Sequence, residues 1–189
     1  MLTRFSEEGI RNVLRRLTRQ GVVSSERVGN AYSYRLNRDH LAAGPVIELA
    51  NLQRTLLNRL EKRCASWRFP PVYAAVFGSA ARGTITVESD IDLFLVRADD
   101  APRVGVWDEQ VGALAAEVTK WTGNDTRPVE YTVRELTDAG AEPMLRDVLA
   151  EALTVAGSRA WLSRQLQQRT RSRAPHPRLH TGGPSRSPA

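Results

Sequence analysis

Two aspartates, Asp90 and Asp92, stand at alternate positions of the apolar segment SDIDLFLV, residues 89–96. In a β-strand, alternate side chains point to the same face, so both carboxylates would lie together while Ile91 and Leu93 enter the core. Two neighbouring carboxylates repel each other and resist desolvation unless a positive charge lies between them. Mg²⁺ meets this need, since it binds one or two carboxylates together with the phosphates of a substrate. The pair therefore predicts a metal site and a nucleotide.

A glycine–serine turn, Gly78-Ser79, follows the apolar run VYAAVF, and ten residues separate Ser79 from Asp90. Glycine lets the backbone approach an anion closely, and the backbone N–H groups and serine hydroxyl of such a turn can donate to phosphate. Arg82 lies one turn further along, where it would contact phosphate or brace the loop. We also expect Ser89, directly before Asp90, among the nucleotide-binding residues.

Together these segments resemble the signature of the DNA polymerase β-like nucleotidyltransferase superfamily, in particular its minimal nucleotidyltransferase branch. In that signature a hydrophobic residue and Gly-Ser are followed, after a spacer, by two aspartates that alternate with hydrophobic residues, and GSAARG and SDIDL match it. The resemblance implies that Gly78 and Ser79 hold the triphosphate and that Asp90 and Asp92 bind two Mg²⁺ ions. It also implies a third carboxylate on a later strand, which completes one metal site and helps to activate the acceptor hydroxyl.

Glu130 is our choice for this third carboxylate, because it lies in PVEYTV, the next strand-like segment after an intervening helix. Many family members have aspartate at that place, so a glutamate changes the reach of the side chain. Glu88 and Glu135 are the alternatives. We expect Glu88 on the strand face of Asp90, and Glu135 in the loop or helix that follows.

The elements that must position these residues predict an α+β protein, and the resemblance implies that they form the nucleotidyltransferase fold, a short mixed β-sheet with flanking helices. Apolar or alternating residues predict strands at 72–77, 89–96 and 128–133, and helical spacing predicts helices at 106–121 and 142–166. Residues 67–166 would form this domain.

The N-terminal residues 1–42 predict a helix followed by a hairpin. Ser6 is a suitable N-cap, apolar residues follow at helical spacing as far as Gly21, and a Gly29-Asn30 turn separates two short strands. This segment resembles the recognition helix and wing of a winged helix-turn-helix, without the helices that precede them in that family. The candidate DNA contacts are the arginines of the helix, Arg11, Arg15, Arg16 and Arg19; the alternative is a solvated helix face.

A long helix from Pro45 to about Arg63 is predicted to fill the connecting segment 43–66, where it would also offer a seam for a homodimer. Residues 167–189 are rich in Pro, Gly, Ser and Arg and are predicted to be a disordered basic tail. The lone cysteine, Cys64, is expected to be a half-buried structural thiol.

Charge is unevenly distributed along the chain. Residues 1–63 carry 12 basic and 6 acidic side chains, residues 64–150 carry 8 and 14, and residues 151–189 carry 7 and 1. Basic flanks are typical of proteins with a polyanion partner, although 25 of the 27 basic residues are Arg, which genome composition would also explain. The chain has no apolar run of membrane-spanning length and no signal peptide, so we expect a cytoplasmic protein without a membrane partner.

The resemblance to nucleotidyltransferases implies a Mg²⁺-dependent enzyme that moves a nucleoside monophosphate from a nucleoside triphosphate to a hydroxyl of a protein, a small molecule or an RNA end. The region 64–160 has no room for the additional parts of a processive polymerase. The resemblance to minimal nucleotidyltransferases implies an antitoxin-like role, with AMP transferred to a helical, toxin-like partner protein. The alternative is a transcriptional regulator that binds DNA through the winged-helix fragment and carries a nucleotide-sensing or degenerate nucleotidyltransferase domain.

Overall fold

A computed structural model describes residues 6–84, 86–139 and 142–172 of the chain. The chain divides into two compact units, Met1–Thr55 and Leu56–Ala189, called unit 1 and unit 2 below. None of the described helices combines the length and the apolar composition that a membrane span requires.

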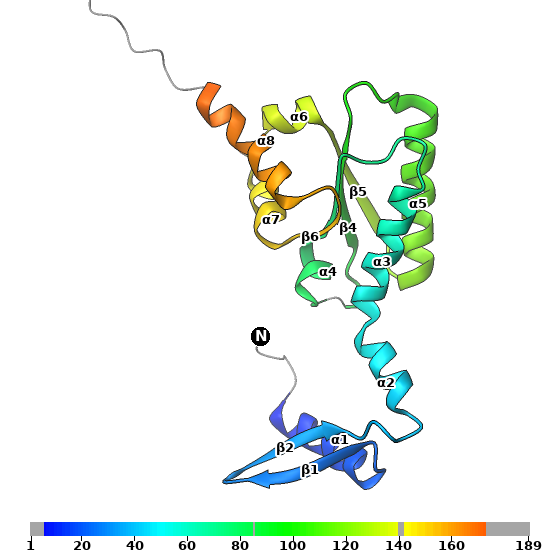
Figure 1. Ribbon diagram of the computed structural model, residues 1–189, viewed down its shortest axis with the longest axis vertical. Helices are drawn as coiled ribbons and strands as arrows, with labels where there is room; N and C mark the ends of the chain where they lie inside the picture. The colour runs from blue at the N-terminus through cyan, green and yellow to red at the C-terminus, as the bar shows by residue number, and fades with distance from the viewer. Residues whose placement is uncertain (1–5, 85, 140–141, 173–189) are drawn as a thin grey trace, which may run out of the picture. The chain divides into compact units, whose positions relative to one another are not determined.

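Unit 1 consists of a helix, a two-stranded hairpin and a second helix (Figure 1). Its elements are α1 (Glu7–Arg19), β1 (Val23–Val28), β2 (Ala31–Leu36) and α2 (Ala43–Ala50). The Ser6 side chain accepts a hydrogen bond from the backbone N–H of Gly9 at 3.1 Å, which confirms the predicted N-cap. The strands pair antiparallel around the Gly29-Asn30 turn. Helix and hairpin form as predicted, whereas their assignment to a winged helix-turn-helix stays a prediction.

The predicted long helix over residues 45–63 is two helices. Asn51 follows α2 with φ −99° and ψ 10°, outside helical values, and α3 then spans Leu52–Ala65. Asparagine has a low helix propensity because its side chain competes for backbone hydrogen bonds. The expectation of one continuous helix is therefore wrong.

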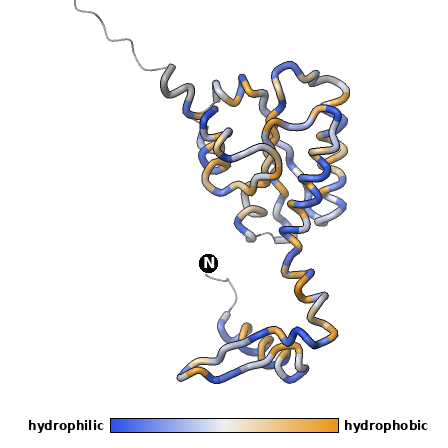
Figure 2. Tube along the Cα trace, in the orientation of Figure 1, coloured by the Kyte–Doolittle hydropathy of each residue, from blue (hydrophilic) through white to orange (hydrophobic). Residues whose placement is uncertain are grey.

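Unit 2 contains a four-stranded mixed sheet with the strand order β5-β4-β3-β6. The strands are β3 (Tyr73–Phe77), β4 (Ile91–Arg97), β5 (Thr126–Thr132) and β6 (Leu153–Ala156). β3 runs antiparallel to both β4 and β6, while β4 and β5 are parallel. Hydrophobic stretches of the chain run through this sheet (Figure 2), which is where the burial of apolar surface stabilises the unit.

Helices cover both faces of the sheet (Figure 1). They are α3, α4 (Gly78–Arg82), α5 (Asp108–Thr122), α6 (Val133–Ala139), α7 (Pro143–Glu151) and α8 (Arg159–Ser172), with a π-helical turn (Arg103–Trp107) before α5. On the face of α3 and α5, Leu60 and Leu114 are each 1% exposed. On the face of α6, α7 and α8, Phe94 and Val96 are fully buried. These are called the α3/α5 face and the α6–α8 face.

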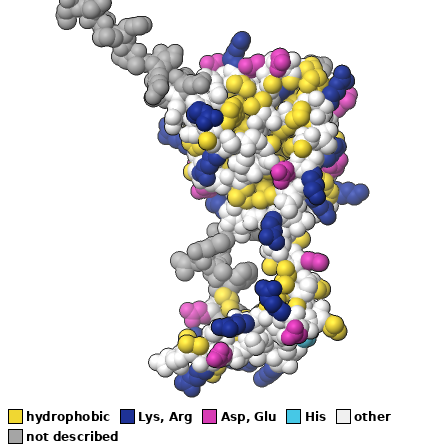
Figure 3. Space-filling view, viewed as in Figure 1, with side chains coloured by type: hydrophobic (Ala, Val, Ile, Leu, Met, Phe, Trp, Pro, Cys, Tyr) yellow, Lys and Arg dark blue, Asp and Glu magenta, His cyan; other side chains and the backbone are white. Residues whose placement is uncertain are grey.

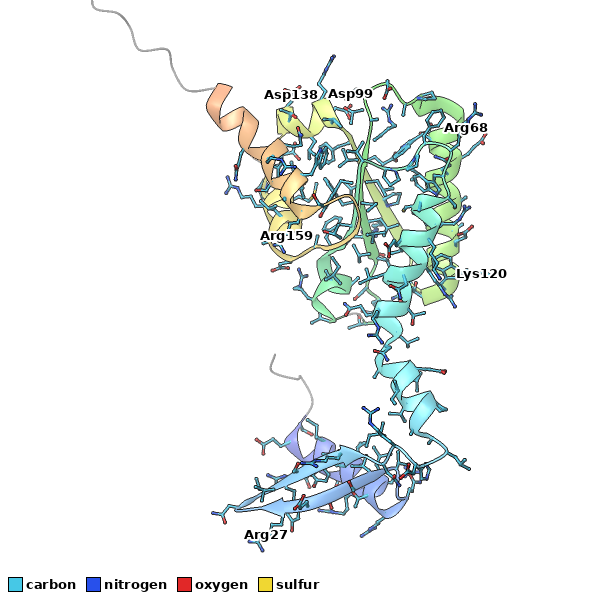
Figure 4. The ribbon with its side chains drawn as sticks, viewed as in Figure 1. Arg27, Arg68, Asp99, Lys120, Asp138 and Arg159 are labelled. Atoms are coloured by element: carbon cyan, nitrogen blue, oxygen red, sulfur yellow. The ribbon has the colours of Figure 1, made fainter. Side chains whose placement is uncertain are left out.

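The C-terminal part of unit 2 differs from the predicted single helix over residues 142–166, because β6 separates α7 from α8. Gly157 follows β6 with φ +74°, and a Cβ there would collide with the backbone oxygen of Val72. Beyond this turn, Arg159 Nη2 donates to the backbone oxygen of Ala150 at 2.6 Å and to that of Leu149, which ties α8 to α7 (Figure 4). A four-residue apolar strand cannot be told from a helix face by its pattern alone, so β6 could not be predicted from the sequence.

Two further boundaries shift. The strand expected at residues 128–133 is β5, which begins earlier at Thr126 and gives way to α6 at Val133. α8 continues to Ser172, so residues 167–172 are helical rather than part of a disordered tail. The remainder of the predicted tail, residues 173–189, lies outside the described residues.

Candidate active site

The two aspartates lie at the start of β4 on the α6–α8 face. Asp92 pairs with Phe77 of β3 on one side and with Arg127 of β5 on the other. Asp90 and Asp92 are half-buried, whereas the intervening Ile91 is fully buried. The predicted alternation of core and site side chains along this strand is confirmed.

The Gly78-Ser79 turn lies directly against this pair, because the sheet places the end of β3 beside the start of β4. Gly78 has φ +68°, and a Cβ at this position would collide with Oδ2 of Asp92. Glycine is therefore required both for the backbone conformation and for the close approach of the carboxylate. The structure brings the two halves of the sequence motif together where the end of β3 meets the start of β4.

Two arginines near the aspartates form ion pairs with different carboxylates. Arg127 Nη1 lies 2.9 Å from Oδ2 of Asp90, while Arg82 Nη1 lies 2.8 Å from Oε2 of Glu151 on α7. Burial, followed by the charge of Asp90, raises the pKa of the Asp92 carboxyl, and the two arginines only partly offset this. A bound cation would stabilise a carboxylate whose ionised form is disfavoured in this way.

Hydrogen bonds order the loop that leads into the pair. The Ser89 hydroxyl accepts from the Thr86 backbone N–H at 2.9 Å. Asn124 Nδ2 donates to the backbone oxygens of Ser89, at 2.8 Å, and of Thr86, at 2.9 Å. Asn124 belongs to no sequence motif, so its role in this loop could not be predicted. The nucleotide contact of Ser89 stays a prediction, and its hydroxyl already closes this turn.

Glu130 does not join the aspartates. It pairs with Leu95, three residues beyond Asp92, which places it about 10 Å further along the sheet and on the α3/α5 face. There its Oε2 accepts a hydrogen bond from Trp107 Nε1 at 2.5 Å. The assignment of Glu130 as third carboxylate is therefore corrected: the register of β5 decides which face each residue takes, and a shift of one residue exchanges the faces.

Neither alternative supplies the third carboxylate. Glu88 is exposed in a turn before β4, and Glu135 Oε2 accepts from the backbone N–H of Thr132 at 2.8 Å, at the start of α6. Glu130 and Glu135 instead line a pocket of about 450 Å³ at the far end of β5, together with Asp138. Within the described part of the chain, no three His, Cys, Asp or Glu side chains are grouped so as to hold a metal ion.

Unit 1 has a groove of its own, of about 700 Å³, between α1 and the hairpin. Its charged and aromatic lining consists of Arg11, Arg15, Arg19, Tyr32 and Tyr34. Arg16 is not among the described residues that line it, so the structure divides the predicted arginine stripe. Figure 3 shows basic side chains on the visible surface of this unit. The tyrosines were missed because a hairpin alternation by itself does not show which face is solvent-exposed.

Solved structures of toxin–antitoxin proteins resemble part of this chain. A toxin–antitoxin with AMP-PNP has a TM-score of 0.43 and 18% identity over 61% of this chain and 85% of its own. The MntA-HepT toxin–antitoxin has a TM-score of 0.40 and 15% identity over 63% and 85%. A tri-AMPylated Shewanella oneidensis HEPN toxin in complex with MNT antitoxin has a TM-score of 0.40 and 15% identity over 64% and 85%.

No curated protein matches the chain significantly. The family described as "Nucleotidyltransferase domain" matches residues 57–155, more than half of the 189 residues and nearly all of the described sheet of unit 2. The mixed sheet with flanking helices is accordingly the predicted α+β nucleotidyltransferase fold. The chain belongs to the nucleotidyltransferase domain family.

Proposed function

We propose that the chain transfers a nucleoside monophosphate from a nucleoside triphosphate to a hydroxyl group. The observation that carries this proposal is the convergence of Asp90 and Asp92 on the Gly78-Ser79 turn, within a region that belongs to the nucleotidyltransferase domain family. Carboxylates beside a glycine turn at one sheet edge are suited to a phosphate-bearing substrate with its metal ion.

The donor set of the site fits Mg²⁺. Asp90 and Asp92 offer carboxylate oxygens, the ligands that Mg²⁺ prefers, and burial together with the charge of Asp90 raises the pKa of Asp92, an effect that a bound cation would oppose. When bound there, the ion would neutralise phosphate charge and lower the pKa of the acceptor hydroxyl. The number of two ions stays a prediction, because only two carboxylates converge among the described residues.

In the proposed reaction the acceptor hydroxyl releases its proton to solvent and its oxygen forms a bond to the α-phosphorus, while the bond from the α-phosphorus to the bridging oxygen breaks, so that pyrophosphate leaves. Gly78 lets the backbone approach the phosphates without a side chain in between. Arg82, held by Glu151, braces the α4 turn. Glu130 takes no part, since it lies on the other face of the sheet.

For the acceptor we propose a hydroxyl of a partner protein, in an antitoxin-like role. This choice follows from the resemblance of GSAARG and SDIDL to minimal nucleotidyltransferases and from the small size of unit 2. Hydroxyls of small molecules or of RNA ends are the other outcomes that the following experiment would detect.

The experiment incubates the chain with each of the four nucleoside triphosphates, labelled at the α-phosphate, together with Mg²⁺ and cell extract. We expect label on a protein fraction, and none with Asp92→Asn, which keeps the size of the side chain but removes its charge. Asp108→Asn is the matched control, because Asp108 is an exposed aspartate on α5. Wild-type transfer by Asp92→Asn would refute the proposed function.

A second candidate function is nucleic-acid binding by unit 1, in a regulator whose unit 2 senses nucleotide. The groove between α1 and the hairpin favours it, because arginines bind phosphates and exposed tyrosines stack on bases. Tyr32 is 62% exposed, and its ring centroid lies 6.4 Å from that of Tyr34.

Fluorescence anisotropy with labelled DNA at several salt concentrations tests this second function. Arg15→Glu should weaken binding and reduce its salt dependence, while Arg16→Glu, on the same helix outside the groove, should have a smaller effect. Equal effects of the two substitutions would indicate unspecific attraction to a basic helix rather than binding in the groove.

A further inference from the structure

Arg127 occupies the place on β5 from which a side chain reaches the two aspartates. It pairs with Asp92 in the parallel register of β4 and β5, so both side chains lie on the α6–α8 face. Its guanidinium contacts Asp90 through Nη1 and Oδ2 at 2.9 Å. A third carboxylate on β5 would have to stand at this position, and the chain has an arginine there instead.

The charge of Arg127 changes what the site can hold. Two carboxylates and one guanidinium leave a single negative charge, which one divalent cation converts into a single positive charge. Three carboxylates with two divalent cations would leave the same single positive charge. With Arg127 in place, a second divalent ion would therefore meet an excess of positive charge without a protein ligand to offset it.

The ion pair between Arg127 and Asp90 is also exchangeable. The Arg127 side chain is 70% exposed and that of Asp90 is 27% exposed, so the arginine can turn away into solvent while the aspartate stays in the site. Exposed ion pairs of this kind contribute little to stability, and a cation at Asp90 would displace the guanidinium. A guanidinium released beside a triphosphate is well suited to bind it, because its planar donors match phosphate oxygens and it stays charged.

We propose that Arg127 takes the place of a second metal ion: the site holds one divalent cation on Asp90 and Asp92, and Arg127 supplies the other positive charge to the triphosphate. This inference rests on the proposed function, and it makes Arg127 a substrate-binding residue of that site. It also explains how an arginine can face the aspartates without blocking the site, since its contact with Asp90 is replaced when substrate and metal arrive.

The first test counts metal ions by electron paramagnetic resonance of Mn²⁺ titrated into the full chain without nucleotide. We expect one Mn²⁺ per chain for the wild type and two for Arg127→Glu, which supplies the missing carboxylate. Arg127→Gln should keep one ion and bind it up to about fivefold more tightly, the amount that an exposed ion pair contributes. Arg134→Glu makes the same charge change on α6, at the other end of β5, and should resemble the wild type.

The second test measures the binding of tripolyphosphate to the Mg²⁺-saturated chain by calorimetry. Loss of a charge-assisted hydrogen bond should raise the Kd for Arg127→Gln by about tenfold or more, whereas Arg134→Gln should leave it unchanged. Urea denaturation of each variant shows whether it is folded.

The inference would be overturned if the wild type bound two Mn²⁺ ions. It would also be overturned if Arg127→Glu bound the same number of Mn²⁺ ions as Arg134→Glu, or if Arg127→Gln bound tripolyphosphate with unchanged affinity. Failure of the proposed function has another signature. In that case the wild type transfers no label in the presence of Mg²⁺ and cell extract, while the metal count and the tripolyphosphate affinity still report on Arg127. A wild type that binds no Mn²⁺ would overturn both.

Discussion

Three glycines of unit 2 with positive φ provide a graded test of the site geometry, because an alanine Cβ would have different surroundings at each. Gly123, at φ +77°, has open space where a Cβ would go. Gly78, at φ +68°, would direct its Cβ into the carboxylate of Asp92. Gly157, at φ +74°, would direct it into the backbone oxygen of Val72. Replacing each glycine with alanine separates backbone strain from collision.

The expected losses in free energy of unfolding follow from these surroundings. Alanine in the left-handed region costs about 1–2 kcal/mol, which is the whole effect expected for Gly123→Ala. In Gly78→Ala, Asp92 must also leave its rotamer, which adds about 0.5–1.5 kcal/mol. In Gly157→Ala the backbone cannot turn aside, and overpacking adds about 1–3 kcal/mol. The predicted destabilisation therefore increases from Gly123→Ala through Gly78→Ala to Gly157→Ala.

Urea denaturation followed by tryptophan fluorescence measures these losses in unit 2 alone. Its signal comes from Trp67, Trp107, Trp121 and Trp161, all of which lie within that unit. The same substitutions in an Asp92→Ala background form a double-mutant cycle that isolates the contact between Gly78 and Asp92. Mn²⁺ affinity should fall in Gly78→Ala, whose carboxylate is displaced, and remain unchanged in Gly123→Ala.

Two results would refute this reasoning. One is a Gly78→Ala protein no less stable than Gly123→Ala. The other is an excess loss in Gly78→Ala that persists when Asp92 is alanine, because the collision partner is then absent.

Three further predictions concern single side chains. Glu130→Gln should leave Mn²⁺ affinity unchanged in a titration, since Glu130 lies on the α3/α5 face. A loss of Mn²⁺ affinity as large as that of Asp92→Asn would show that Glu130 belongs to the metal site. Cys64 is 1% exposed, and burial raises its pKa to about 11. Iodoacetamide should therefore label this thiol far more slowly in the native chain than in urea at the same mildly alkaline pH. Equal labelling rates would contradict its burial. Burial and the charge of Asp90 raise the pKa of Asp92, so the native state binds the proton of this carboxyl more tightly than the unfolded state does. The free energy of unfolding should therefore fall as pH rises through the range above the ordinary aspartate pKa. Asp92→Asn should lack this fall and be at least as stable as the wild type at neutral pH, as measured by urea denaturation; a less stable variant would show that the ionised carboxylate stabilises the fold.

Much of the fold could be predicted because its determinants are local. The Ser6 N-cap depends on a hydrogen bond to Gly9, three residues away, and the hairpin of unit 1 depends on a two-residue turn. The longer-range features were harder. β6 is a short apolar segment that becomes a strand only because it pairs with β3, and nothing within the segment distinguishes it from a continuation of α7.

The sequence by itself determined the two halves of the candidate site. Strand alternation places Asp90 and Asp92 on one face, and a turn that needs a glycine ends the preceding strand at Gly78; both follow from residues within a few positions of each other. Only the tertiary structure decided the third participant. The parallel register of β4 and β5 places Arg127, rather than Glu130, beside Asp92, and no local pattern encodes the register between strands that are distant in sequence. Because a slip of one residue exchanges the two faces of a strand, that register determines whether the aspartates face a third carboxylate or a guanidinium.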